Sequence, residues 1–299
     1  FLGAKPEKTP AMYSLMNYAD LVLGTWYPKG GMAKIGEAFY QLAVELGVKF
    51  EFGQNVKDVL IHNGNITEVI SDKSSFTADM VVNSADYHHF EQHILPESHR
   101  MYDERYWDKR TMAPSSLLFY LGIDKQIPGL EHHNLFFDKD FGLHANEIYE
   151  TPKWPTDPLF YVCCPSKTDP TVAPKNKENL FLLMPLAVDL DDDDQLRAKY
   201  RKMMIDRMEE HLNVSIQDHI IFEKSYAIND FKQDYNSYKG NAYGLANTLN
   251  QTAILKPKMK SKKVGNLFYT GQLTTPGPGV PPSIISGEVV AIEVQKILN

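Results

Sequence analysis

The chain has 299 residues, 43% of them hydrophobic and 23% charged, which is the composition of a globular protein long enough for two domains. With 31 basic and 38 acidic residues the net charge is −7, and there is no basic cluster, which argues against a nucleic-acid partner. The two cysteines, Cys163 and Cys164, are adjacent in an apolar run, so neither a disulfide framework nor a metal site is indicated, and a reducing compartment fits.

The first fifty residues predict two helices and a strand. Apolar residues recur at helical spacing over residues 12–22, and a second amphipathic helix is predicted over residues 32–46. The pair Gly30-Gly31 stands before this second helix, which by itself is an ordinary way to begin one. Alternating apolar and charged residues over 48–52 predict a half-buried strand.

The next segment predicts a hairpin and a buried strand. Two apolar runs, residues 56–61 and 66–70, flank Asn63-Gly64, the strongest two-residue hairpin signal. Residues 78–86 then predict a buried strand that runs into a turn of small residues around Ala85.

From residue 87 to about residue 229 the chain changes to aromatic strands separated by polar loops. Such a run with few helices predicts an α+β domain with a mixed sheet. The expected strands are residues 115–123, 134–137, 159–164, 180–188 and 219–226, and the expected helix is residues 195–212.

Two features of this region invite a functional interpretation. The pairs His88-His89 and His132-His133 offer imidazole ligands, but neither has a third and fourth partner at ligand spacing, so the sequence predicts no metal site. The acidic run Asp191 to Asp194 is predicted to cap the following helix and to face solvent.

The last part of the chain combines a strand, a rigid loop and a helix. Residues 266–270 predict a buried strand, and residues 271–282 form a loop of glycines and prolines. Small and apolar residues at helical spacing follow from Ile284 onward. This layout can bring backbone N–H groups onto an anion or a polar ring edge. From spacing alone, a stiff surface loop is an equal alternative.

The segment from Asn266 to Gly287 resembles the C-terminal signature of bacterial and fungal phytoene desaturases, which are FAD-dependent carotenoid desaturases. Their pattern is an apolar strand ending in glycine, then a Thr-x-Pro-Gly-x-Gly-Val/Ile-Pro loop. The aromatic-Pro-x-Gly-Gly turn of residues 27–31 is also similar to one in that family. Gln272, Leu273 and Pro278 depart from the small residues common there. The matching positions are Gly271, Thr274, Pro276, Gly277, Gly279, Val280, Pro281 and Gly287.

The resemblance implies an α/β fold, α+β overall, with part of a glutathione-reductase-like FAD-binding domain and a mixed-sheet substrate domain. Residues 25–90 and 240–299 would form the FAD-binding domain, and residues 1–24 and 91–239 the substrate domain. No side chain is an evident catalytic base. The FAD contacts that the resemblance implies are Gly30, Gly31, Val56, Ala85, Gly271, Gln272, Pro276, Gly277, Gly279, Val280 and Pro281.

The implied activity is desaturation of a long polyene, phytoene or a related carotenoid precursor, by hydride transfer to the flavin in carotenoid biosynthesis. A carotenoid isomerase, an oxygenase or a retinol saturase-like protein of the same fold is an alternative. The chain begins without Met and contains no GxGxxG, so we expect it to be the C-terminal part of a longer protein and inactive alone. A further alternative is therefore an inactive fragment that serves only as an interaction module.

A hydrocarbon substrate implies contact with a membrane surface. The sequence has no run of about 18 apolar residues, so the expected location is cytoplasmic with peripheral membrane attachment. Nothing in the sequence indicates an oligomeric state. The aromatic residues expected to contribute to a membrane-binding patch are Trp107, Phe136, Phe137, Phe141 and Trp154.

Overall fold

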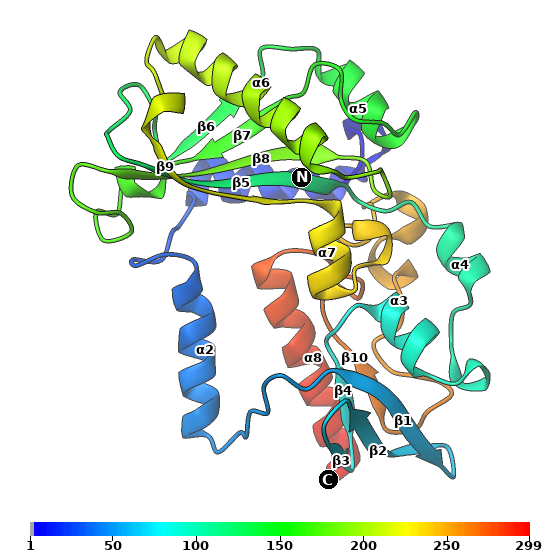
Figure 1. The fold of residues 1–299 in the computed structure, drawn as a ribbon. Coiled ribbons are helices and arrows are strands. Elements are labelled where there is room, and N and C mark those ends of the chain that lie inside the picture. Colours follow the sequence, from blue (N-terminus) through cyan, green and yellow to red (C-terminus); the bar gives the residue numbers. More distant parts are fainter. Residues whose placement is uncertain (1–2) are drawn as a thin grey trace. The chain divides into compact units, whose positions relative to one another are not determined.

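A computed structural model describes residues 3–299 as two compact units (Figure 1). Unit 1 contains residues 3–10, 51–114 and 230–299, and unit 2 contains residues 11–50 and 115–229. Each unit is therefore built from segments that are distant in the sequence. The assignment of an FAD-binding and a substrate domain to particular residues stays a prediction.

The first sheet of unit 1 is a three-stranded antiparallel meander. β1 (Val56–His62) pairs with β2 (Asn65–Ser71), and β2 pairs with β3 (Ser75–Thr77). Asn63 and Gly64, at the turn between β1 and β2, have φ angles of 48° and 75°, as the tight hairpin turn requires. The predicted hairpin is confirmed.

The second sheet of unit 1 is a parallel pair. β4 (Val81–Asn83) lies beside β10 (Leu267–Tyr269), with Val81 opposite Leu267. All three residues of β10 are buried. The side chain of Asn266 joins this pair to the hairpin, because its Oδ1 accepts from the N–H of Ile66 and its Nδ2 donates to the carbonyl of Ile66, both at 2.8 Å.

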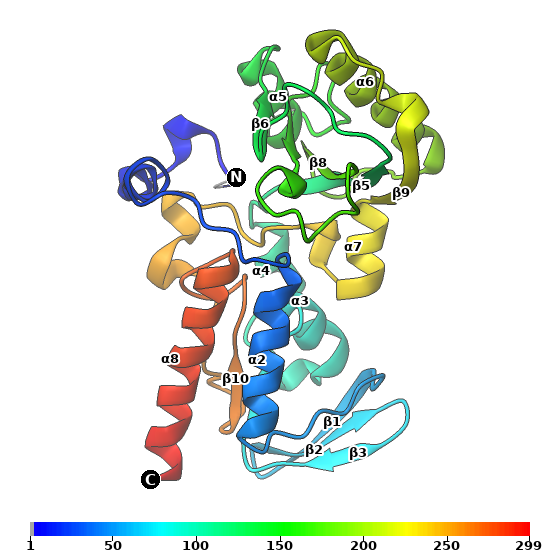
Figure 2. The same ribbon diagram turned by 90° about the vertical axis from the view of Figure 1, so that its left-hand side faces the viewer.

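One long helix and three short ones complete unit 1. Figures 1 and 2 show α8 (Val280–Leu298) running alongside β10. The short helices are α3 (Tyr87–His89), α4 (Glu104–Asp108) and α7 (Ile228–Tyr235), whose first two residues belong to unit 2.

Unit 2 is built on a five-stranded sheet with the strand order β6-β7-β8-β5-β9. The predicted strands are confirmed to within two residues, but the predicted mixed sheet is wrong. All four strand pairs among the described residues are antiparallel. The strands are β5 (Ser115–Ile123), β6 (His133–Phe136), β7 (Phe160–Cys163), β8 (Glu178–Leu186) and β9 (Ile220–Tyr226).

The core of unit 2 lies between this sheet and α6 (Asp194–Leu212), which crosses one face of the sheet (Figure 1). Tyr200, Met204 and Met208 of α6 are buried against Phe119 and Leu182 of the central strands. Burying side chains of this size stabilises the fold by about 1.5–3 kcal/mol each. The predicted helix is confirmed.

The acidic run before α6 follows its prediction except at Asp192, since Asp191, Asp193 and Asp194 are exposed. Asp193 caps the helix by accepting a 2.8 Å hydrogen bond from the N–H of Leu196. The neighbouring Asp192 does not face solvent, because its carboxylate has no exposed surface and pairs with both Nε and Nη2 of Arg197, at 2.7 and 2.5 Å. The planar guanidinium can hold a carboxylate in this two-point way.

The N-terminal part of unit 2 contains α1 (Leu15–Tyr18), flanked by other helical turns, and α2 (Ala33–Glu45). Both agree with the sequence. The strand predicted over residues 48–52 is absent, because no described strand pairs with it, and its apolar residue Phe52 is 74% exposed. A helix that the sequence did not predict, α5 (Phe141–Tyr149), begins at the capping side chain of Asp140.

Within residues 3–299, no helix combines the length and the apolar character needed to cross a bilayer.

Candidate active site

The candidate site lies where the two parallel strands of unit 1 end. β4 and β10 run in the same direction, so their carboxyl ends meet at one edge. The N–H of Thr270 donates a 2.9 Å hydrogen bond to the carbonyl of Asn83 and keeps the two chains together just beyond the strands. In sheets with parallel strands, ligands bind in the crevice outside this edge.

A cleft of about 610 Å³ opens at this edge. Two stretches that leave the strands form one part of its wall, and α7 with the segment that follows it forms another. The cleft is large enough for a ring system of several fused rings. Its lining consists of Ser84–Tyr87, Phe231, Asp234–Ser237, Asn241, Ala242, Thr270–Leu273 and Ser283.

Asp86 is the acidic group at the end of β4. Its carboxylate caps α3 by accepting from the N–H of His89 at 2.9 Å, and it also accepts from the N–H of Tyr238 at 3.3 Å. Burial disfavours the charged form and raises the pKa of Asp86 to about 6, although these backbone hydrogen bonds act in the opposite direction. The group therefore titrates close to neutral pH.

Hydrogen bonds within the loop after β10 hold it in a tight conformation. The backbone N–H and the hydroxyl of Thr274 both donate to the carbonyl of Gly271, at 3.0 and 2.8 Å. Gly271 has a φ of 97°, a conformation that favours glycine. The loop therefore presents its backbone to the cleft with little side-chain bulk.

The start of α8 supplies few free N–H donors. Gly279 precedes the helix with a φ of 116°, and Pro281 and Pro282 carry no N–H group. The N–H of Ser283 already donates to the carbonyl of Gly279 at 3.0 Å. The sequence predicted that this helix start binds either an anion or the polar edge of a ring. With so few free N–H groups, it suits the ring edge better.

The charge of the cleft also favours an uncharged ring edge over an anion. Its charged lining residues are Asp86 and Asp234, and its lining contains no lysine, arginine or histidine. A phosphate group would be repelled by these carboxylates. An uncharged aromatic ring system with polar edges fits the lining, since Gln272, Asn241 and Ser283 can each form hydrogen bonds.

A buried lysine lies beside the loop. Lys256 is 2% exposed, and its ammonium has no hydrogen-bond partner among the described residues. A Cβ added at Gly277 would lie 3.3 Å from the Cε of Lys256, which is a tight contact, and the φ of 135° at this position also favours glycine. Burial lowers the pKa of Lys256 to about 8. An acceptor atom of a bound cofactor could satisfy this donor.

A buried cluster behind β10 fixes the strand that carries the loop. The rings of Tyr87 and Tyr269 stack with centroids 3.9 Å apart, and the hydroxyl of Tyr269 donates to the carboxylate of Glu91 at 3.2 Å. Glu91, which is fully buried, also accepts the N–H groups of Met101 and Tyr102. Desolvation raises the pKa of Glu91 above its ordinary value.

The structure brings together three of the predicted cofactor residues, Ala85, Gly271 and Gln272, in the lining of this cleft. Other predicted residues lie in unit 1 but outside the lining. Val56 begins β1, and Pro276, Gly277, Gly279, Val280 and Pro281 continue the loop into α8.

Gly30 and Gly31 belong to unit 2. There the N–H of Gly30 donates a 2.6 Å hydrogen bond to the carboxylate of Asp169, and the N–H of Gly31 donates to the carbonyl of Pro28. These contacts fix the shape of the turn. The roles of all these residues toward a cofactor stay predictions.

Sequence reasoning did not find the far wall of the cleft. Phe231, Asn236, Ser237 and Asn241 come from α7 and the segment after it, where the sequence predicted no cofactor contact. Asn241 is the organising residue, since its Oδ1 accepts from the N–H of Gly244 at 2.7 Å and from Gln272 Nε2 at 3.3 Å. The one local signal in the sequence was the spacing of Asn241 and Gly244, because asparagine and glycine are both common in tight turns.

Comparison with known proteins identifies the family. The model of the flavin-containing amine oxidoreductases matches residues 1–295. This chain belongs to that family. Its membership confirms the expectation of an FAD cofactor, and the cleft described above fits the ring portion of such a group.

Relatives of known name are carotenoid enzymes, as the resemblance implied. A carotenoid 3,4-desaturase of Haloarcula japonica is 42% identical over 97% of this chain and 59% of its own length. A zeta-carotene-forming phytoene desaturase of Myxococcus xanthus is 32% identical over 97% of this chain and 56% of its own. The chain thus spans somewhat more than half the length of these relatives.

Solved structures confirm the α/β fold class. An oxidoreductase of Methanosarcina mazei aligns with a TM-score of 0.64 at 16% identity, covering 94% of this chain and 58% of that one. A putrescine oxidase variant aligns with a TM-score of 0.56 at 10% identity, covering 89% and 53%. At these identities the likeness concerns the fold alone.

Proposed function

We propose that this chain functions in the FAD-dependent desaturation of a long polyene, a carotenoid or a carotenoid precursor. Support comes from its membership of a flavin-containing family together with the activities for which its relatives are named. The structural observation that carries the proposal is the cleft at the carboxyl ends of β4 and β10, which is free of cationic groups.

In this proposal the residues of unit 1 hold and orient the flavin. The backbone of Gly271 and Gln272, after β10, and Ala85, after the neighbouring strand β4, would hold the ring system. Gln272 and Asn241 would supply hydrogen-bonding groups for its polar edge. The bound flavin supplies the hydride acceptor that protein side chains lack.

The reaction removes two hydrogens from neighbouring carbons of the substrate. One would leave as hydride, for which the flavin would be the acceptor, and the other as a proton to solvent or to a base that we do not assign. An external oxidant, a quinone or oxygen, must then take up the two electrons. The product is the polyene with one further double bond.

Mass spectrometry of the product tests the proposal. The full-length protein that contains this chain, purified with FAD, is incubated with liposomes containing phytoene or a hydroxylated carotenoid. We expect products lighter by two hydrogens. An unchanged mass with a new isomer would indicate an isomerase, a gain of oxygen an oxygenase, and a gain of two hydrogens a saturase. No product with a flavin-loaded protein would favour the interaction module.

The oxygenase alternative has a specific observation in its favour. A relative named 4,4'-diaponeurosporene oxygenase, from Staphylococcus haemolyticus, is 29% identical over 99% of this chain. The desaturases match at 42% and 32% identity, so desaturation is the better supported of the two.

We further propose that the protein takes its substrate from a membrane surface. Two aromatic residues expected in a membrane-binding patch, Trp107 and Phe136, are buried at 0% and 8% exposure, and Trp154 packs against the core of unit 2. Phe137 and Phe141 are exposed at 57% and 51%. They lie close in sequence to Leu135 and Leu143, which are also exposed, so we assign the membrane contact to this segment of unit 2.

A further inference from the structure

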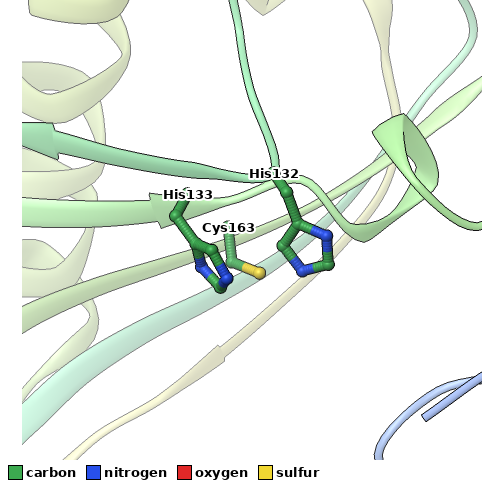
Figure 3. Close-up of side chains that lie close together, drawn as sticks. All are labelled: His132, His133 and Cys163. Atoms are coloured by element: carbon green, nitrogen blue, oxygen red, sulfur yellow. The ribbon is translucent and has the colours of Figure 1, made fainter. Parts of the chain in front are cut away.

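Two histidines and a cysteine converge at one edge of the sheet of unit 2 (Figure 3). His132 and His133 stand at the start of the edge strand β6, and Cys163 ends the neighbouring strand β7. The antiparallel register places His133 directly opposite Cys163. One possible ligand atom from each of the three side chains lies within 4.8 Å of the other two.

The ring of His132 is held by one nitrogen and leaves the other without a partner. Nδ1 lies 2.6 Å from the hydroxyl oxygen of Thr168, and this hydroxyl in turn donates to the carbonyl of Pro165 at 3.4 Å. We therefore assign the proton to Nδ1 and a lone pair to Nε2. His132 is 8% exposed, and its Nε2 is buried with no hydrogen-bond partner among the described residues.

The ring of His133 is held in the same way. Its Nδ1 lies 2.5 Å from the hydroxyl of Tyr161, which also forms a hydrogen bond with the sulfur of Cys163. Tyr161 and Cys163 are two residues apart on β7, so their side chains share one face of the strand. Nε2 of His133 remains for a further interaction. Figure 3 shows one nitrogen of each ring turned toward the sulfur.

The three side chains and their hydrogen-bond partners are arranged like the ligands of a metal site and the residues that orient those ligands. Histidines that bind metals usually form a hydrogen bond through the second ring nitrogen, which fixes the orientation and the tautomer of the ring. Thr168 and Tyr161 are in the positions of these outer partners. A buried nitrogen without a partner costs about 1–3 kcal/mol, and a metal ion would remove that cost.

We propose that Nε2 of His132, Nε2 of His133 and Sγ of Cys163 bind one transition-metal ion of the zinc type, with a fourth position open to solvent. Two imidazoles and one thiolate are ligands that zinc accepts, whereas calcium and magnesium require oxygen. Bonds of about 2.0–2.3 Å place tetrahedral ligands roughly 3.5 Å apart, so the site must contract by about 1 Å. Rotation of the exposed His133 side chain can provide this change.

The surroundings indicate what a bound ion would do. The histidines line a cleft of about 630 Å³ together with the turn of residues 25–29 and residues 168–171. The ring of Tyr27 packs edge-on against His132 with centroids 4.9 Å apart. An ion bound here would hold the β6 edge and this turn in place, so we expect it to raise the thermal stability of unit 2.

Cobalt titration of the flavin-free, chelator-treated chain tests the site. A thiolate that binds Co²⁺ produces a charge-transfer absorption band, which reports the sulfur ligand directly. Cys164→Ser is the matched control, because Cys164 follows Cys163 immediately but points to the other side of the strand, where its sulfur lies 3.5 Å from the hydroxyl of Ser166. Circular dichroism establishes that each variant is folded.

We expect one equivalent of Co²⁺ to give the band in the wild type and in Cys164→Ser, and Zn²⁺ to displace it. Cys163→Ser should lose the band, and His132→Ala or His133→Ala should weaken Co²⁺ binding at least tenfold. Tyr161→Phe, which keeps all three ligands, should weaken binding by roughly tenfold through the outer hydrogen bond. Absence of the band in the folded wild type would overturn the proposal. So would its persistence in Cys163→Ser, its loss in Cys164→Ser, or more than one equivalent bound.

Discussion

The backbone N–H of Gly271 donates a 3.0 Å hydrogen bond to the hydroxyl of Ser286 and joins the loop after β10 to α8. Ser286 is fully buried, and its own hydroxyl donates to the carbonyl of Ser283 at 2.7 Å. This side chain therefore serves as acceptor for the loop and as donor within the helix. The position of the loop depends on it.

Ser286→Ala should lower the free energy of unfolding by about 1–3 kcal/mol, because the N–H of Gly271 loses its acceptor in a buried place. Urea denaturation measures the change. The exposed Ser98 provides the control, since Ser98→Ala should change stability by no more than about 0.5 kcal/mol. Equal effects in the two variants would show that the loop is held by other contacts.

Ala85→Phe should reduce flavin retention severalfold while leaving the fold intact. Ala85 lines the cleft, so a larger side chain there occupies the space of the ring. Ala78→Phe places the same side chain at an exposed position of unit 1 outside the cleft and should retain the wild-type flavin content. Flavin content per protein is read from the visible spectrum after gel filtration. The cleft is not the flavin site if both variants keep the same amount.

Riboflavin should bind the isolated chain about as tightly as FAD. The cleft lining contains two carboxylates and no cationic side chain, so it offers nothing to the pyrophosphate. Fluorescence titration with the two compounds measures the ratio of dissociation constants, which we expect to stay within about threefold. Binding of FAD that is a hundredfold tighter would reveal a phosphate contact elsewhere in the chain.

Asp86→Asn should remove part of the pH dependence of stability. The pKa of Asp86 is raised from 3.8 to about 6, so the folded state binds more protons than the unfolded state between these values. This group therefore makes the fold less stable as pH rises through that window, by up to about 3 kcal/mol. Asparagine keeps an acceptor for the N–H of His89 and cannot ionise.

The measurement for Asp86 is urea denaturation at pH 4 and pH 7. The loss of stability on going to pH 7 should be smaller in Asp86→Asn than in the wild type. Asp79→Asn, at an exposed position, should follow the wild type. An unchanged pH profile in Asp86→Asn would mean that the pKa of Asp86 in the folded wild type is close to its ordinary value.

Replacing Phe137 and Phe141 together by Ser should weaken liposome binding severalfold, since two exposed aromatic side chains lose their contact with lipid. Flotation of the protein with liposomes measures the effect. Ile221 and Phe222 on β9 are each 58% exposed and provide the control pair. If both double variants lose binding equally, general hydrophobicity and not this segment governs attachment.

The sequence predicted those parts of the fold whose signals are local. Asn63-Gly64 specifies its hairpin by backbone conformation alone, and the strands of unit 2 follow from apolar runs. The family resemblance implied Ala85 and Gly271 as cofactor contacts, and the structure places each of them in the cleft lining, two residues beyond a strand of the parallel pair. The strand expected around Phe50 failed because a strand needs a neighbour, and local alternation does not supply one.

Other features depend on contacts that no local pattern contains. Cys163 becomes a neighbour of His133 only through the register of β6 and β7. Asp192 is buried because Arg197, from the first turns of α6, folds back onto it. Likewise Phe231 reaches the cleft from a segment far from either strand. In each case the contacts of the residue come from tertiary packing, and its neighbours in the sequence give no signal of them.

The parallel pair of β4 and β10 has a kinetic consequence. Val81 and Leu267 are paired although most of the chain lies between them, and contacts of such long range form slowly because loop closure comes first. During synthesis β4 leaves the ribosome long before its partner, whereas the β1–β2 hairpin can form at once. The candidate cleft at the carboxyl ends of β4 and β10 is therefore assembled late, and a chain stalled before residue 267 carries the hairpin but not this cleft.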